Sequence, residues 1–403
     1  MKLFNIFGLA VAAVLTTVSF ASCDDDDDTV KSYKLHISLS SSEVESSLLS
    51  GLKVYISGTS NDTLDLDAIT AATVTLPQGT YNVAVDGKVS DDVTKRVNGS
   101  ASNIALYEDQ SVDVELATYY KSPLVFKTIY STGGAQYYVM DSYIEIVNNS
   151  DEVQYLDGLI LADPLSNLKA QSAWQEAYPD LYCCGQGNVL AFPGNGTDYP
   201  LQPGEFIVLA DEALNHQLQY EEDESLKEQY AKCPDLSAAN WEKYYGNGDI
   251  DNEAVHNVKR IFSNNQYMKM WAFGAMGRSY ILAKLPEGVD PETFAADENN
   301  LKTTPGSTSS TLYLMIPSAY VLDAVELYNP ATDPAENYPF FLEKDDVKGI
   351  QCSASYTGKC VRRKVSAIEN GRVYYQDTNN SSNDWKNEQD NTPAYVPTTV
   401  DAE

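Results

Sequence analysis

The sequence predicts a mainly β protein built from two antiparallel β-sandwich domains, the second of which carries helical insertions. Two observations favour this fold class. Apolar and polar residues alternate with a period of two over many short stretches, and turns rich in glycine, proline and asparagine separate those stretches. The chain also contains 28 tyrosines against 11 phenylalanines, and tyrosine suits strands that are half buried.

Residues 1–22 have the organisation of a signal peptide. Lys2 precedes an apolar run from Leu3 to Val18, and small residues follow it up to Cys23. The run is shorter than the ~20 residues that span a bilayer, so we expect cleavage before Cys23. The arrangement resembles the lipobox of bacterial lipoproteins, which implies that Cys23 carries palmitate-type acyl chains. The alternatives are an uncleaved anchor helix and an ordinary signal peptide.

Residues 23–29 are expected to form an acylated cysteine followed by an acidic tether. The five aspartates Asp24–Asp28 repel one another, which favours a solvated spacer. A start of serine, cysteine and aspartates also resembles the export signal with which certain Gram-negative anaerobes bring lipoproteins to the outer face of the outer membrane. That resemblance implies a lipid-anchored, surface-exposed protein of the cell outer membrane.

The charge of the chain limits its partners. It has 58 acidic and 27 basic side chains and a formal net charge of -31. A surface of this kind repels phosphate backbones, so nucleic-acid binding is not expected. On average the electrostatic field of the protein favours cationic ligands.

Residues 30–118 are expected to form a small sandwich of about six strands, because short apolar stretches alternate there with turns. The positions expected to face its core are Leu35, Ile37, Leu39, Leu52, Val54, Ile56, Val74, Leu76, Tyr81, Val83, Val85, Ile104, Leu106, Val112, Val114 and Leu116. The stretch LPQGTYNVAV at residues 76–85 looks like a motif of prealbumin-like and carboxypeptidase-regulatory-like sandwiches. The resemblance implies a spacer or contact-mediating domain without chemistry of its own.

The second domain is expected to occupy residues 123–403, after a boundary near Tyr119–Pro123. Its first strand is Leu124–Tyr130, and a second strand includes Tyr143, Ile144 and Ile146. An asparagine-rich turn at Asn148–Asp151 follows, and Leu156–Leu161 is expected to return antiparallel to the second strand.

Several stretches in this region resemble parts of the immunoglobulin-like lamin-tail domain. They are DSYIEIVNNSDEVQYLDGLIL at 141–161, LQPGEFIVLADEA at 201–213, YVLDAVELYN at 320–329, CVRRK at 360–364 and DTNNSSNDW at 377–385. The layout of the whole chain is similar to a family of bacterial surface lipoproteins of unknown function, commonly encoded beside TonB-dependent transporters.

Two segments depart from the lamin-tail pattern. The insertion between Ala210 and Met268 contains EDESLKEQYAKC and LSAANWEKYY, both helical in composition, and Asp235–Ser237 is a candidate cap for the second. Residues 286–310 are rich in proline, asparagine, threonine and serine, which predicts a surface loop. Loops on a sandwich commonly carry binding sites, so we expect any ligand site there.

Five cysteines follow Cys23, so not all of them can pair: Cys183, Cys184, Cys233, Cys352 and Cys360. Cys352 and Cys360 are close enough in sequence to close a short loop, and one of the adjacent pair Cys183 and Cys184, here taken as Cys184, is a candidate partner for Cys233; buried free thiols are the alternative. No metal site is expected, because there is no CxxC pair, the three histidines are scattered and the acidic stretch at 247–253 lacks the spacing of an EF-hand.

The loop at residues 377–385 is the candidate ligand loop. Asp377, Asn379, Asn380 and Asp384 lie near Trp385, an arrangement that would suit a sugar or metal above an aromatic floor. The interpretation that we prefer is structural: these side chains satisfy the backbone of a tight loop.

No motif for nucleophilic or metal-dependent hydrolysis is found in the sequence, and with 58 acidic residues a pair of carboxylates would arise by chance. We therefore expect a binding protein without a cofactor rather than an enzyme. The family resemblance implies an accessory component of a TonB-dependent nutrient uptake system, with iron, haem or another metal complex as cargo. The alternatives are a surface adhesion or assembly module that binds host protein or glycan, and an unrecognised hydrolase.

Overall fold

The computed structural model of the 403-residue chain describes residues 30–66, 71–90, 92–166, 168–185, 188–220, 223–246, 249–265, 267 and 277–401. The expected signal peptide, Cys23 and the aspartate tether lie outside these residues. Strands dominate the described chain, which confirms the predicted mainly β class. No helix within the described ranges is long and apolar enough to cross a bilayer.

Residues 32–120, here called the N-terminal unit, form two packed sheets. One sheet has the strand order β3-β2-β5-β6-β8 and the other the order β4-β1-β7. Neighbouring strands are antiparallel, except that β1 and β7 run parallel. The strands are β1 (Ser32–Ser40), β2 (Leu49–Gly58), β3 (Asp62–Leu66), β4 (Ala71–Pro77), β5 (Gly79–Val89), β6 (Asp92–Leu106), β7 (Gln110–Glu115) and β8 (Ala117–Tyr120).

The period-two pattern explains how these two sheets pack. In β1, Leu35, Ile37 and Leu39 are buried while their sequence neighbours are exposed, and they share one apolar core with residues from the other strands. Tyr81, from the predicted turn motif, is fully buried and donates a hydrogen bond of 2.8 Å to the carbonyl of Pro77. The six expected strands all form, and β3 and β8 are two additional strands.

The remaining chain, residues 124–401, is called the C-terminal unit, and most of its strands belong to one 11-stranded sheet. The sheet curls, because β9 near one end contacts β22 and β19 near the other, and the curl encloses the main apolar core. In sheet order the strands are β22 (Val321–Val325), β19 (Tyr280–Lys284), β12 (Leu159–Ala162), β14 (Val189–Ala191), β18 (His256–Phe262), β17 (Trp241–Lys243), β16 (Phe206–Ala210), β10 (Tyr143–Asn148), β9 (Leu124–Tyr130), β25 (Lys359–Arg363) and β28 (Trp385–Asp390).

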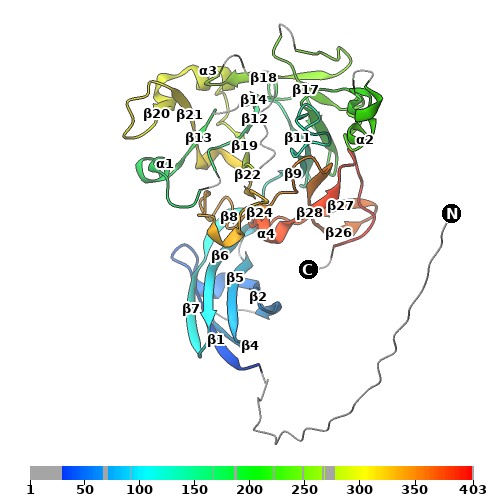
Figure 1. The fold of residues 1–403 in the computed structure, drawn as a ribbon. Coiled ribbons are helices and arrows are strands. Elements are labelled where there is room, and N and C mark those ends of the chain that lie inside the picture. Colours follow the sequence, from blue (N-terminus) through cyan, green and yellow to red (C-terminus); the bar gives the residue numbers. More distant parts are fainter. Residues whose placement is uncertain are drawn as a thin grey trace, which may run out of the picture.

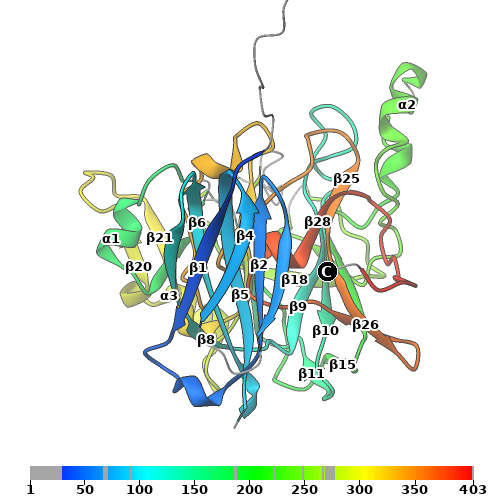
Figure 2. The same ribbon diagram turned by 90° about the horizontal axis from the view of Figure 1, so that it is seen from below.

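Smaller sheets and short helices surround this curled sheet. The further strands are β11 (Gln154–Tyr155), β13 (Leu181–Cys184), β15 (Pro200–Leu201), β20 (Leu301–Thr303), β21 (Leu312–Pro317), β23 (Leu327–Tyr328), β24 (Ile350–Gln351), β26 (Val365–Glu369) and β27 (Arg372–Tyr375). The α-helices are α1 (Ala173–Ala177), α2 (Lys227–Tyr230), α3 (Pro291–Ala296) and α4 (Ser381–Asp384). Figures 1 and 2 show α1 and α2 at opposite sides of the C-terminal unit.

The predicted pairing of Leu156–Leu161 with the strand before it is wrong. Strand β10 pairs with β9 and β16, whereas β12 pairs with β14 and β19 in the other half of the curled sheet. The chain crosses over at Gly158, which has a positive φ of 69° that favours glycine. The apolar pattern of the stretch fixes that it is a strand but does not specify its neighbour.

The predicted helix in LSAANWEKYY is also wrong. Residues Trp241–Lys243 of this stretch form β17, which lies parallel to both β16 and β18. Trp241 is buried in the main core, with its ring 4.9 Å from Phe192 and 4.8 Å from Tyr199 between centroids. Burial of this ring outweighs a weak helical propensity. Asp235 accepts hydrogen bonds from Ser237, but no helix follows them.

The stretch EDESLKEQYAKC and residues 286–310 agree only in part with the secondary structure predicted for them. EDESLKEQYAKC forms a 3-10 turn at Glu224–Leu226 and the short helix α2. Residues 286–310 are more ordered than a surface loop, because they contain α3 and β20, and α3 buries Phe294 and Ala295. The prealbumin-like and lamin-tail resemblances and the domain limits stay predictions.

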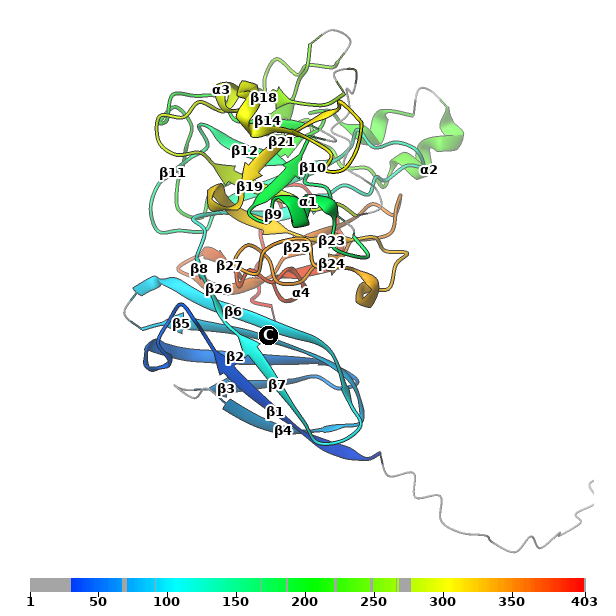
Figure 3. The same cartoon turned by 90° about the vertical axis from the view of Figure 1, so that its left-hand side faces the viewer.

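The two units meet along one face of the N-terminal unit. Figures 1 and 3 show β5 and β6 nearer than β1 and β4 to the C-terminal unit, with α4 above them. Contact is direct, since the side-chain amide of Asn98 on β6 donates hydrogen bonds to the carbonyls of Thr378 (3.2 Å) and Asn379 (3.4 Å).

Candidate functional site

Arg363, on β25, is the centre of a buried ion-pair cluster. Its side chain is 1% exposed, and its Nη2 lies 2.6 Å from the carboxylate of Asp323 on β22. Its Nη1 lies 3.4 Å from Asp377, and its Nε donates a 2.6 Å hydrogen bond to the carbonyl of Phe126. The guanidinium also lies over the ring of Trp385, 4.9 Å from its centroid. The cluster therefore joins three strands to the loop that starts at residue 377.

That loop is held in shape largely by its own side chains. Asp384, 3.9 Å from Arg363, accepts hydrogen bonds from the amide (2.8 Å) and hydroxyl (2.7 Å) of Thr378 and from the amide of Asn380. Asn380 caps α4 by accepting from the amide of Asn383. Burial raises the pKa of Asp384 to about 6, although Arg363 opposes the shift. The structure thus brings the predicted loop residues together. Asp384 and Asn380 bond to amides of the loop itself, whereas Asp377 bonds to Arg363 and Asn379 donates to the carbonyl of Lys344.

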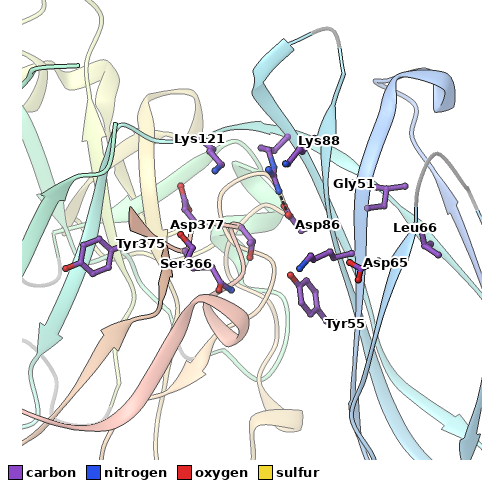
Figure 4. Close-up of a pocket in the computed structure, with 15 residues that line it drawn as sticks. Gly51, Tyr55, Asp65, Leu66, Asp86, Lys88, Lys121, Ser366, Tyr375 and Asp377 are labelled. Atoms are coloured by element: carbon purple, nitrogen blue, oxygen red, sulfur yellow. Dashed lines mark hydrogen bonds and ion pairs between the residues drawn. The ribbon is translucent and has the colours of Figure 1, made fainter. Parts of the chain in front are cut away.

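A cleft of about 400 Å³ lies beside this loop, between the two units; we call it the junction cleft. Figure 4 shows side chains from both units facing one another across it. One wall is the outer face of the five-stranded sheet and the other is formed by Ser366 and residues 375–378. Asp377 belongs to both the cleft and the Arg363 cluster, so the cluster fixes the position of the second wall.

Strand alternation explains why the first wall is polar. In β5, Val85 and Val89 point into the core, so Asp86 and Lys88 point out. In β6 the same rule turns Arg96 towards the cleft.

The polar groups of this wall are fixed by a buried pair. Arg96 forms a salt bridge with Asp86, and the hydroxyl of Tyr119 donates a 2.8 Å hydrogen bond to the same carboxylate. Burial raises the pKa of Asp86, while Arg96, Tyr119 and Lys121 each oppose that shift. Lys121, in the link between β8 and β9, is therefore within electrostatic reach of the pair.

The balance of charge in the junction cleft differs from that of the protein. Four basic residues line it, against three acidic ones: Lys53, Lys88, Arg96 and Lys121, with Asp65, Asp86 and Asp377. This concentration of basic residues could not be recognised in the sequence, because polar residues on the outer face of a sandwich strand resemble an ordinary solvated surface. None of the residues 286–310, where we expected a ligand site, lines the junction cleft.

Residues 286–291 line another hollow, of about 760 Å³, on the C-terminal unit. The only carboxylate that faces it from outside this stretch, among the described lining residues, belongs to Asp157. Its oxygens accept hydrogen bonds from the amides of Gly196, Asp198 and Tyr199. The carboxylate is thus engaged in holding a turn, so the larger hollow carries less available chemistry than the junction cleft.

The structure corrects the two predicted disulfides. Every cysteine in the described part of the chain is a buried free thiol. Cys352 lies in the main core and Cys360 in a separate cluster with Tyr130 and Tyr143, so their side chains are buried apart despite their closeness in sequence. Burial raises the pKa of both thiols to about 12.

The second predicted pair is separated in the same way. Cys184, on β13, packs in an apolar cluster with residues of β19 and β21. Cys233 lies instead beside the backbone of Gly134 and interacts with Asp141. Burial raises the pKa of Cys184 and of Cys233 well above the ordinary value of a thiol, so both thiols stay protonated.

The histidines also lie apart and contact other protein groups. His36 bonds to Thr73, His216 bonds to Tyr138 at 2.7 Å, and His256 packs against Trp241. In the described ranges no three histidine, cysteine or acidic side chains are grouped so that they could hold a metal ion.

Comparison with known proteins finds that part of the chain is similar to one family. Residues 202–392 match DUF4876, a family of proteins of unknown function. A crystal structure of a DUF4876 family protein from Bacteroides thetaiotaomicron is 28% identical to this chain, with a TM-score of 0.58, and the match covers 91% of this chain and 99% of that one. This agrees with the expected family of unknown function, without testing the prealbumin-like and lamin-tail descriptions.

The other comparisons add no functional information. A candidate adhesin from Bacteroides ovatus is 12% identical, over 47% of this chain and 70% of that one, with a TM-score of 0.20. That likeness is too low to support an argument. No functionally curated protein matches the chain. The DUF4876 match contains Arg363 and the 377–385 loop but begins after the N-terminal unit, so it includes only one wall of the junction cleft.

Proposed function

We propose that this protein is a non-enzymatic binding lipoprotein on the outer membrane surface, and that it serves as an accessory component of a TonB-dependent nutrient uptake system. The observation that carries the binding role is the junction cleft, whose walls come from both β units. Its volume of about 400 Å³ lies within the usual range for small-molecule sites.

The walls of the cleft are fixed before any ligand arrives. The Asp86 and Arg96 pair orients groups on the N-terminal wall, and the Arg363 cluster holds Asp377 on the opposite wall. A site whose polar groups are already positioned loses less conformational entropy on binding. This favours a binding role for the cleft.

The location rests on the N-terminal sequence. Acylation of Cys23 would anchor the chain, since several buried acyl chains hold a protein at a membrane almost irreversibly. The acidic tether and the N-terminal unit would then separate the cleft from the lipid. Iron, haem or another metal complex is the cargo that the family resemblance implies.

The test is purification of the C-terminally tagged protein from native outer membranes in mild detergent, followed by identification of its partners. We expect a TonB-dependent transporter barrel to accompany it. A protein that stays alone even after crosslinking of whole cells would contradict the uptake role. Binding to host protein or glycan that persists without any transporter would favour the adhesion alternative.

The Cys23→Ala variant provides the matched control for location. It should lose incorporation of radiolabelled palmitate and leave the outer membrane fraction, while the wild-type chain is labelled and cleaved by external protease on intact cells. A wild-type protein that carries no label, or that is protected in intact cells, would refute the surface lipoprotein assignment.

A further inference from the structure

We propose that the junction cleft binds a small organic anion with two or more carboxylates, held by Lys88 and Lys121 beside the paired Arg96. This inference rests on the binding role proposed above and names the class of ligand. The shared chemistry is the carboxylate, which can come from a free organic acid or from the metal complex of one.

The first argument is a concentration of positive charge in an acidic protein. Four of the chain's 27 basic side chains line this one cleft, in a chain with a formal net charge of -31. Only three acidic residues line it. The overall charge, which favours cationic ligands, is therefore a poor guide to this site, because an anion inside the cleft is governed by the nearest charges.

The second argument is that two of these cations are exposed and form no salt bridge within the described part of the chain. Lys88 and Lys121 are exposed, and within the described part of the chain neither forms a salt bridge. Asp86, the buried carboxylate of this wall, is already bound to Arg96 and Tyr119. The ammonium groups of Lys88 and Lys121 are thus available to a ligand.

The third argument is a like-charged pair within the sheet. Lys88 on β5 lies directly opposite Arg96 on β6, and like charges in that position destabilise a sheet. Asp86 offsets the charge of Arg96 but not that of Lys88. Lys88 is therefore the charge of this pair that remains uncompensated, and an anion in the cleft would neutralise it.

The arrangement favours spread charges over a single compact anion. The available lysines lie on different elements, with Lys88 on β5 and Lys121 after β8, and Figure 4 shows both beside the Asp86 pair at one side of the cleft. The guanidinium of Arg96 is already paired, so a bidentate phosphate site is not available. A molecule with two carboxylates can place one on each lysine, while Gln376 and Ser366 line the opposite wall of the cleft.

The test is calorimetric titration of the full-length lipoprotein in mild detergent at low salt. Four probes are used: citrate, iron(III) citrate, inorganic phosphate and glycerol. We expect binding of citrate or of its iron complex, and the tighter of the two identifies the source of the carboxylates. Binding should weaken as salt is added.

Two double variants separate the cleft from general charge. K88Q/K121Q removes both cleft lysines, and K169Q/K227Q makes the same change of net charge at exposed lysines outside the cleft lining. The first should weaken binding by about 10-fold or more, as expected for two lost charge-assisted contacts, and the second should change it less than about 2-fold. K88R/K121R, which keeps the charge, should retain most of the affinity.

Several results would overturn the inference: no binding of either citrate probe, phosphate bound as tightly as citrate, or equal losses in the two Gln double variants. The transporter experiment is read separately. A protein that purifies with a transporter but binds no carboxylate probe would contradict this inference alone. Carboxylate binding by a protein without a transporter partner would contradict only the uptake role.

Discussion

Replacing Arg363 by Met tests whether the buried cluster holds the C-terminal unit together. The substitution keeps most of the apolar length but removes the charge shared by Asp323, Asp377 and Asp384. Removing one partner of a buried ion pair typically costs 3–5 kcal/mol. The variant also loses the hydrogen bond to Phe126, worth about 1 kcal/mol. We therefore expect its free energy of unfolding to fall by about 4–6 kcal/mol at pH 7.5.

The pH dependence makes this test sharper. Burial already raises the pKa of Asp384 to about 6 while Arg363 opposes the shift, so the pKa rises further when Arg363 is removed. A carboxyl whose folded pKa is raised is stabilising when protonated, and that stability is lost as the pH rises through the folded pKa. The loss in Arg363→Met should thus be smaller at pH 5.5 than at pH 7.5.

The assay is urea denaturation at both pH values, followed by tryptophan fluorescence, to which Trp385 beneath the guanidinium contributes. Arg372→Met is the control, because Arg372 pairs with an Asp151 side chain that is 83% exposed. Such a surface pair is worth at most about 1 kcal/mol. A loss below about 1 kcal/mol in Arg363→Met, or equal losses at both pH values, would refute the reasoning.

Three further predictions concern buried groups. Burial and the nearby Asp346 raise the pKa of Glu326, so stability falls as the pH rises through that pKa; Glu326→Gln should raise the melting temperature more at pH 8 than at pH 5. In thiol titration of the folded chain, none of the five described cysteines should react, and all five should react in denaturant without reductant; reaction of only one would indicate two disulfides. Trp241→Ala should lower the free energy of unfolding by about 3–5 kcal/mol, measured by urea denaturation, because it empties a core site.

Local alternation of apolar and polar residues correctly predicts the position of several strands. Leu124–Tyr130 was expected as a strand and forms β9 over the same residues. The stretches YVLDAVELYN, CVRRK and DTNNSSNDW resemble separate parts of the lamin-tail domain, and the structure brings Asp323, Arg363 and Asp377 from them together in one cluster. Their mutual contact could not be read from the sequence, since more than thirty residues separate the first two.

The errors share one cause, which is dependence on distant partners. The segment around Trp241 is a strand because Phe192 and Tyr199 provide a site for the indole ring. Cys352 and Cys360 are close in sequence but are buried in different clusters. In both cases the local pattern permits more than one outcome, and packing against residues far along the chain selects between them.

The sequence by itself determined the mainly β class and most strand positions, because a period of two in side-chain direction is a local property of an extended backbone. Only the tertiary structure decided where the junction cleft lies and which charges line it. Lys88 and Lys121 belong to the N-terminal unit and its link, whereas Asp377 belongs to a loop more than two hundred residues later. Charges act on a ligand through distance in space, and the folding of one unit against the other sets that distance.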